Sequence, residues 1–186
     1  MTTRTDNTPL LDRYDSYADG FSAVLETFPA DAWDNASPCE GWTARDVVTH
    51  VIESQREFFA HHDLDLGLAP SSDDPVAAWR AHREAVAALL ADPGVGERRF
   101  DGHFGPTTIG ETLVRFYGFD MIAHRWDVAA AAGVVHRFSD EELDELSAGA
   151  DGFGDALYAE GVCTRIEVPE GADRQTTVLA RLGRRT

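Results

Sequence analysis

A carboxyl group and an imidazole stand four residues apart on the apolar face of one predicted helix, and this pair limits what the chain can fold into. Read at helical spacing, that face carries Ile109, Leu113, Tyr117, Asp120, His124, Val128 and Ala131. Residues i and i+4 lie one above the other on the same side of a helix, so Asp120 and His124 point together toward the expected core. Burying a polar group without a partner costs roughly 2 to 7 kcal/mol. Either a divalent metal ion or a simple ion pair between the two side chains must offset this cost.

A third polar side chain interrupts the apolar face of an earlier predicted helix. His50 lies on the line of Val47 and Val51, away from the charged side of that segment. A single histidine on a core face is more often a hydrogen-bonded core residue than a metal ligand. Two helices each carry such an exception, so one metal ion bound by His50, Asp120 and His124 would account for both; a core histidine beside a buried ion pair is the alternative. Three nitrogen and oxygen ligands that leave positions open for water or substrate are typical of a catalytic metal site.

The size and charge of the chain exclude several classes of protein. Its 186 residues, 43% of them hydrophobic, suffice for one globular domain with a sizeable core. A net charge of −17 repels phosphate backbones, so we expect no nucleic-acid partner. No apolar run approaches the roughly 20 residues of a membrane span, and the first residues form no apolar signal segment, which predicts a cytoplasmic protein without a membrane partner. Two cysteines, Cys39 and Cys163, are too few for a disulfide framework.

Periodicity and capping signals predict a series of helices separated by polar connections. They cover residues 10–27, 43–62, 74–92, 107–133 and 140–158, with a last short helix over 174–183. Thr43 with Asp46 and Ser139 with Glu142 have the spacing of capping boxes. Residues 95–106 are expected to form an irregular hairpin or a loop, and residues 162–169 an extended segment. Long amphipathic helices predict an all-α bundle, whose interior is a usual place for metal sites. We therefore expect disordered residues 1–9 followed by a single metal-binding bundle over residues 10–186.

Two segments of the sequence resemble a known superfamily. The segment PCEGWTARDVVTH, residues 38–50, and the segment FDMIAHRWDVAAAAG, residues 119–133, together resemble the DinB-like superfamily. More closely, they resemble the actinobacterial-type metal-binding proteins that are related to the N-terminal domain of mycothiol-dependent maleylpyruvate isomerase. The tail DRQTTVLARLGR, residues 173–184, also resembles the tail of that subgroup, so the resemblance extends over nearly the whole chain.

The resemblance implies a DinB-like four-helix bundle in up-down-down-up order, here with an additional C-terminal helix and a short tail. It also implies one divalent metal ion, often zinc, bound by His50, Asp120 and His124. Family members of known chemistry use the metal to activate a low-molecular-weight thiol such as mycothiol. This implies a thiol-dependent transferase or isomerase acting on a small electrophile, with mycothiol as cosubstrate. A non-catalytic metal- or ligand-binding bundle is the alternative, and a homodimer is left open.

The chain differs from the isomerase in two respects. Asp120 stands where the isomerase is expected to carry Glu, and the chain is too short to hold a further C-terminal domain of the isomerase's size. The ligand types themselves also accept nickel, iron or manganese, with selectivity set by geometry and supply. A thiol coordinated to the metal is deprotonated and becomes a nucleophile at neutral pH.

Several neighbouring side chains are candidates to support the site. By spacing alone, Glu53, Gln55 and Asp127 could orient the ligand imidazoles, as the other ring nitrogen of a ligating histidine usually needs a partner. Cys39 is interpreted as a packing residue. His82 is interpreted as an interface or surface histidine, although its place near the apolar side of the third helix would also let it approach the site.

Overall fold

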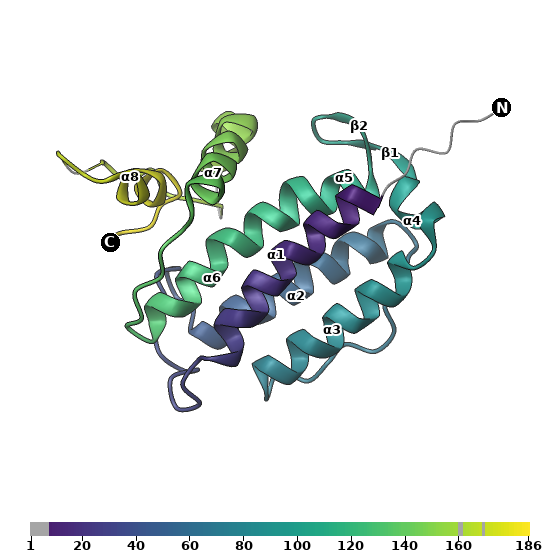
Figure 1. Ribbon diagram of the computed structural model, residues 1–186, viewed down its shortest axis with the longest axis horizontal. Helices are drawn as coiled ribbons and strands as arrows, with labels where there is room; N and C mark the ends of the chain where they lie inside the picture. Colours follow the sequence, from purple (N-terminus) through teal and green to yellow (C-terminus); the bar gives the residue numbers. More distant parts are fainter. Residues whose placement is uncertain (1–7, 160–161, 169) are drawn as a thin grey trace.

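A group of four helical rods encloses the main hydrophobic core. The computed structural model describes residues 8–159, 162–168 and 170–186. The rods are α1 (Thr8–Glu26), α2 (Ala44–His61), α3 (Pro75–Leu90) and a composite rod that ends in α6 (Phe119–Ala131). Both α1 and α2 pack against α6 and against α3, which closes the ring. In Figure 1, α1 and α6 run in one direction and α2 and α3 in the opposite one, because residues 62–74 return along the bundle.

The chain is mostly helical, as predicted, but it is not all-α. A short helix, α4 (Pro93–Glu97), leads into strands β1 (Arg99–Gly102) and β2 (Gly105–Thr108). The strands pair antiparallel, with Arg99 opposite Thr108, and Gly105 takes a positive φ of 105° at the turn. The turn therefore uses a conformation that glycine adopts without strain. The predicted disorder of residues 1–9 is wrong for residues 8 and 9, which begin α1, and residues 1–7 lie outside the described part of the chain.

Local capping signals set the helix starts as predicted. The Thr43 hydroxyl accepts from the Asp46 N–H while the Asp46 carboxylate accepts from the Thr43 N–H, and Ser139 and Glu142 form the same reciprocal pair. Each capping box satisfies backbone donors that have no partner inside the helix. These caps place the start of α2, and hence His50, by short-range chemistry alone.

The rod predicted as one helix over residues 107–133 is interrupted. It consists of α5 (Ile109–Thr112), a π-helical segment over Leu113–Gly118 and then α6. Gly118 lies against the ring of Tyr17 on α1, and a Cβ at this glycine would come within 2.4 Å of that ring. Gly118 therefore allows α1 and this rod to approach each other closely. π-helical turns inside α-helices are frequent at functional sites, and this one ends two residues before Asp120.

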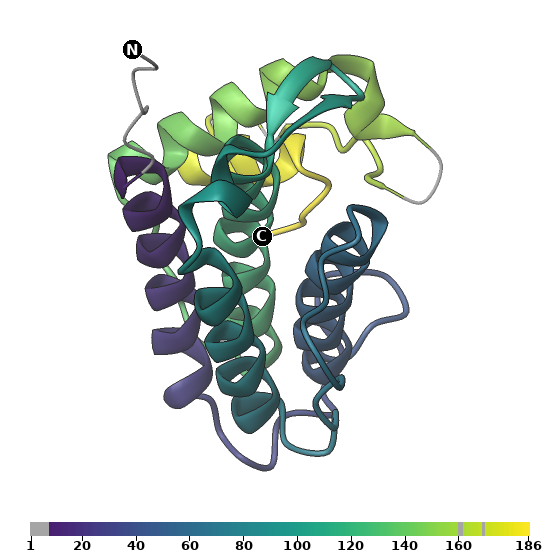
Figure 2. The same cartoon turned by 90° about the vertical axis from the view of Figure 1, so that its right-hand side faces the viewer.

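A second hydrophobic cluster lies on the other side of α6. It joins α6 to α7 (Asp140–Phe153), the 3₁₀ segment Gly154–Tyr158 and α8 (Arg174–Arg181), through buried residues such as Ile122, Leu146 and Leu179. Figures 1 and 2 both place α7 and α8 outside the group of four rods, on the side of α6. The helix predicted over 140–158 ends early because Gly154 takes a positive φ of 53°. The predicted extended segment forms no strand in its described part, and residue 169 lies outside that part.

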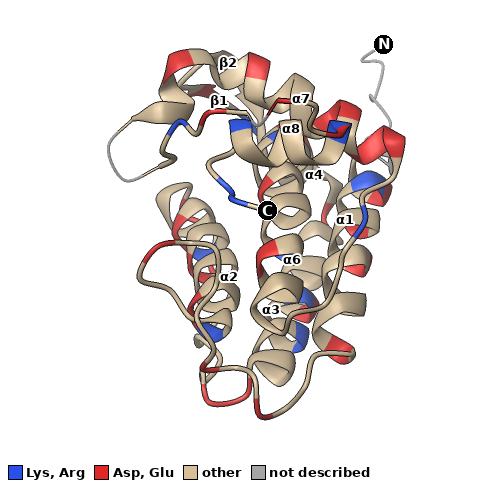
Figure 3. Ribbon diagram, turned by 90° about the vertical axis from the view of Figure 1, so that its left-hand side faces the viewer, with Lys and Arg blue, Asp and Glu red and all other residues tan. Residues whose placement is uncertain are grey.

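Acidic residues are spread over the helices and the connecting loops rather than gathered on one element, as Figure 3 shows in red. This distribution fits the net charge of −17. Within the described residues, no helix has the combination of length and apolar character that crossing a bilayer requires.

His82 is buried in the core and is not the surface or interface residue that the sequence suggested. The Oε1 atom of Gln55 accepts a hydrogen bond from the Tyr14 hydroxyl at 2.6 Å and lies 3.1 Å from Nε2 of His82. Both Gln55 and His82 have no solvent exposure. Burial, together with the nearby charge of Arg56, lowers the pKa of His82 to about 4. The network ties α1, α2 and α3 together, and His82 belongs to neither group of candidate metal ligands among the described residues.

We expect His82 to make the fold sensitive to acid. Its pKa is about 4 in the folded chain and about 6.5 when unfolded, so protonation favours the unfolded chain. The free energy of unfolding should therefore hold above pH about 6.5 and fall by up to about 3 kcal/mol at lower pH. Urea unfolding of the metal-free protein across this range would measure the loss. The His82→Leu variant should lack this component, whereas a variant at the exposed His103 should retain it. Equal pH slopes in wild type and His82→Leu would contradict the assignment.

Candidate metal centre

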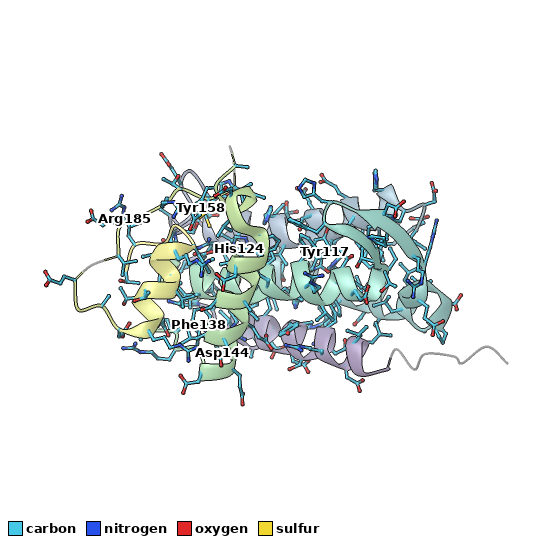
Figure 4. All side chains as sticks on the ribbon, turned by 90° about the horizontal axis from the view of Figure 1, so that it is seen from above. Tyr117, His124, Phe138, Asp144, Tyr158 and Arg185 are labelled. Atoms are coloured by element: carbon cyan, nitrogen blue, oxygen red, sulfur yellow. The ribbon has the colours of Figure 1, made fainter. Side chains whose placement is uncertain are left out.

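The three residues predicted as metal ligands lie together between α2 and α6. His50 projects from the middle of α2, and Asp120 and His124 project from the first turns of α6; His124 is labelled in Figure 4. The Asp120 carboxylate lies between the two imidazoles. Its Oδ2 is 3.7 Å from Nε2 of His50, and its Oδ1 is 3.2 Å from Nε2 of His124. Two helices far apart in sequence therefore present nitrogen and oxygen atoms to one point.

The spacing of these atoms suits a single metal ion. One candidate ligand atom from each of the three residues lies within 4.8 Å of the other two. Nitrogen and oxygen ligands bind zinc at about 2.0–2.2 Å, so two of them around a tetrahedral ion are roughly 3.4 Å apart. The side chains of His50 and Asp120 are 37% and 28% exposed, whereas that of His124 is 9% exposed. The group is thus open to solvent beside His50 and closed behind His124.

The second nitrogen of His124 has partners of its own. Nδ1 lies 2.9 Å from Oδ2 of Asp127, whose side chain has no solvent exposure. The guanidinium of Arg184 donates to both oxygens of the same carboxylate, from Nε at 3.2 Å and from Nη2 at 2.8 Å. Cys39 adds its thiol, 3.4 Å from Oδ2 of Asp127. A row of hydrogen bonds therefore supports the buried side of the His124 ring.

Cys39, His124 and Asp127 form a second group with the spacing of metal ligands. It uses Nδ1 of His124, whereas the first group uses Nε2. Both Asp127 oxygens already accept from Arg184, so a cation in the second group would lie against a guanidinium charge. Asp120 has no such arginine bonded to it among the described residues. The first group is therefore the better cation site, and Asp127 is better suited to orient His124.

The charges around the two imidazoles favour different protonation states. Burial lowers the pKa of His50 by more than Asp120 raises it. Burial alone would also lower the pKa of His124, but the carboxylates of Asp120 and Asp127 outweigh it and raise that pKa well above its ordinary value. Burial would raise the pKa of Asp127, but Arg184 and His124 lower it to about 2. In the metal-free protein, a proton on His124 therefore balances the carboxylates that surround it.

Two aromatic residues border the group. The ring of Trp42, in the turn before α2, lies 4.8 Å from the His50 ring and 6.3 Å from the His124 ring, measured between centroids. The Tyr117 hydroxyl donates to the Ser54 carbonyl at 3.2 Å and so joins the π-helical segment to α2 one turn beyond His50. Trp42 shields one side of both imidazoles, and Tyr117 fixes the distance between the helices that carry them.

The structure separates the candidate supporting residues. Asp127 contacts His124, whereas Glu53 is exposed and Gln55 belongs to the buried network with His82. Cys39 packs as expected, but against the polar pair of His124 and Asp127. Sequence reasoning missed Arg184. No local signal marks it, since its partner is 57 positions away in the chain.

The site residues of α2 and α6 all fall inside a region that matches known proteins. The family model described as Mycothiol maleylpyruvate isomerase N-terminal domain matches residues 15–129. Two relatives, each described as an uncharacterised protein, come from Mycobacterium tuberculosis strains CDC 1551 / Oshkosh and ATCC 25618 / H37Rv. Each is 28% identical over 115 residues, which are 62% of this chain and 63% of the relative. The match thus spans less than two thirds of the relatives' length. No solved structure matches the chain.

The family match covers the residues that build the centre, apart from Arg184. It includes His50, Asp120, His124 and Asp127 together with α2 and most of α6. It extends over more than half of the 186 residues, and it agrees with the resemblance that the motifs around His50 and His124 indicated. The chain belongs to the mycothiol maleylpyruvate isomerase N-terminal domain family, within the DinB-like superfamily.

Proposed function

We propose that this protein binds one divalent metal ion through His50, Asp120 and His124 and uses it to activate a small thiol for reaction with a small electrophile. The observation that carries the proposal is the meeting of these three side chains, from two helices, at a point open to solvent on one side. The family name adds mycothiol as the thiol and isomerase chemistry as one reaction class, and transfer of the same thiol to the electrophile is the other class that we propose. The frame is a DinB-like bundle in up-down-down-up order that forms one domain beginning with α1.

The donor set supports zinc as the metal. Two imidazoles and one carboxylate, with a further position for water or substrate, are the ligands of many catalytic zinc sites. The same set also accepts nickel, iron or manganese, and supply in the cell then decides between them. Among the described residues, no fourth His, Cys, Asp or Glu joins the group of His50, Asp120 and His124. This favours a reactive centre over a closed structural one.

The residues around the centre have separate tasks in the proposed reaction. The bound metal would lower the pKa of a coordinated thiol, so that the thiolate is present at neutral pH. Asp127 holds the His124 ring with Nε2 directed at the centre. Trp42 covers the imidazoles from one side and leaves the approach beside His50 and Asp120. The thiol and the electrophile would enter from that exposed side.

We expect about one metal ion per chain in the purified protein, measured by elemental analysis. His50→Ala and His124→Ala should each lose most of it, because two remaining ligands hold a divalent ion weakly. His103→Ala is the matched control, since His103 is exposed at the hairpin turn and should keep the wild-type content. Metal that survives in both ligand variants, or a wild type that binds none after repletion, would refute the proposed centre.

Metal binding should release a proton from His124. The pKa of His124 is higher in the folded chain than the value of about 6.5 in the unfolded chain. Its proton therefore stabilises the metal-free fold fully below about pH 6.5, and this contribution is lost as pH rises through the folded pKa. A metal must displace this proton from Nε2, so affinity should rise by roughly tenfold per pH unit until that pKa is passed. Calorimetric titration with Zn²⁺ in two buffers of different ionisation enthalpy would count the protons released. An affinity independent of pH would show that His124 is not a ligand.

A thiol should bind only to the metal-loaded protein. We expect titration of the cobalt-substituted protein with mycothiol to produce a thiolate-to-cobalt charge-transfer band, because the thiol sulfur occupies an open coordination position. His50→Ala treated in the same way should give no band, and the S-methylated thiol is a second control because it cannot form a thiolate. If neither mycothiol nor another cellular thiol perturbs a centre that binds cobalt, the protein is a metal-binding bundle without thiol chemistry.

A further inference from the structure

We propose that Arg184, in the segment after α8, is a positioning residue for the metal centre, acting on His124 through Asp127. This inference rests on the proposed function, because it assigns a task to a residue behind one of the proposed ligands. Arg184 lies outside residues 15–129, the region that the family model matches.

The contact between Arg184 and Asp127 has the geometry of a forked pair. Nε donates to Oδ1 at 3.2 Å and Nη2 donates to Oδ2 at 2.8 Å. The remaining nitrogen, Nη1, donates to the Leu182 carbonyl at 2.6 Å. Two parallel hydrogen bonds from a planar guanidinium fix both the position and the rotation of a carboxylate. The pair is shielded, because the side chain of Asp127 is 0% exposed and that of Arg184 is 15% exposed.

The fixed carboxylate in turn fixes the imidazole. Oδ2 of Asp127 accepts from Arg184 and also lies 2.9 Å from Nδ1 of His124. Asp127 and His124 are three residues apart on α6, so their separation along the helix is set by the backbone. The side chains of Asp127 and His124 can still rotate about their own bonds. The two hydrogen bonds from Arg184 prevent this rotation for Asp127. The ring of His124 is then held with Nε2 facing Asp120 at 3.2 Å.

Local structure delivers Arg184 to this position. The helix α8 ends in a turn in which Gly183 takes a φ of 80°, and the Arg184 N–H donates to the Leu179 carbonyl at 2.8 Å. A Cβ at Gly183 would lie 2.8 Å from the Cys163 sulfur and 2.9 Å from the Thr164 carbonyl oxygen. Glycine is therefore required both by the backbone conformation and by the close approach of residues 163–164. This turn directs the chain from α8 back toward α6, where Arg184 meets Asp127.

The competing explanation is that Arg184 only docks the tail, as a structural ion pair. A second ion pair of α8 provides the control that distinguishes docking from positioning. Arg181 on α8 pairs with Asp151 on α7 at 2.5 Å, and their side chains are 38% and 71% exposed. This pair helps to dock the same helix but touches neither Asp127 nor His124. If Arg184 only docks the tail, replacing either arginine should affect stability and leave the metal centre unchanged. If Arg184 positions His124, only its replacement should alter the centre.

The test compares Arg184→Gln, Arg184→Lys and Arg181→Gln in the full chain. We expect Arg184→Gln to bind Zn²⁺ about 10- to 100-fold more weakly, the range typical of residues that orient a metal ligand. Arg184→Lys should recover part of the affinity, because it restores the charge but not the fork. Arg181→Gln should stay within about twofold of wild type. Circular dichroism and thermal unfolding establish that each variant is folded. If Arg184→Gln does not fold, the zinc affinity of Arg184→Lys is compared with that of Arg181→Gln, and only Arg184→Lys should bind more weakly than wild type.

Two spectroscopic measurements report on the ring itself. The d–d absorption of the cobalt-substituted protein should change in Arg184→Gln and remain as in wild type in Arg181→Gln. In the metal-free protein, the His124 Nδ1 proton should exchange with solvent faster in Arg184→Gln than in wild type, because the Asp127 carboxylate that accepts it is no longer held. The line width of its nuclear magnetic resonance signal measures this exchange. Wild-type zinc affinity and an unchanged cobalt spectrum in Arg184→Gln would overturn the inference while leaving the proposed function intact. If the wild-type protein binds no metal, both the proposed function and the role of Arg184 are wrong. This result is known from the wild type alone, before any variant is compared.

Discussion

A carboxylate with no access to solvent organises this end of the molecule. Asp127 lies on α6 between the two hydrophobic clusters, where an unpaired charge would cost several kcal/mol. It remains ionised because Arg184, His124 and Cys39 surround it with donors. These donors come from the tail, from α6 and from the loop before α2. A single buried charge therefore joins three segments that are distant in sequence. The proposed centre lies on the other side of the His124 ring, at Nε2.

The two nitrogens of His124 have different surroundings, and this difference gives the site its chemistry. Nδ1 faces a carboxylate that is fixed by an arginine, whereas Nε2 faces Asp120 near the solvent-exposed side. In the metal-free protein, the carboxylates raise the pKa of His124, so a proton occupies the position that a cation would take. A metal ion bound by His124 would therefore compete with a proton for Nε2, while Nδ1 stays paired with Asp127.

Short-range signals in the sequence predicted the helices and the three residues of the candidate site. The features that the sequence did not predict depend on contacts between distant residues. The capping pairs Thr43–Asp46 and Ser139–Glu142 lie within single turns, and the spacing of Asp120 and His124 places them on one face whatever surrounds the helix. The π-helical segment over Leu113–Gly118 interrupts a rod that periodicity predicted as one continuous helix. The burial of His82 depends on Gln55, 27 positions away. The contact of Arg184 with Asp127 depends on where α8 docks, so a periodicity argument could not find it.

The proposed ligands are held with unequal rigidity, and this bears on how the centre would bind an ion. The helix α6 is packed on both sides, by the main core and by the cluster with α7 and α8, so Asp120 and His124 form a fixed pair at 3.2 Å. His50 comes from α2, which packs on the main core alone, and it lies farther from Asp120, at 3.7 Å. Asp120 is one methylene shorter than Glu and cannot reach outward to shorten that distance. Closing the centre around a cation would therefore fall to the side chain of His50, because the hydrogen bond from Tyr117 to the Ser54 carbonyl holds α2 at its distance from the rod. An ion would meet two ligands already in place and one that adjusts, which allows tight binding and still leaves the exposed side free for substrate.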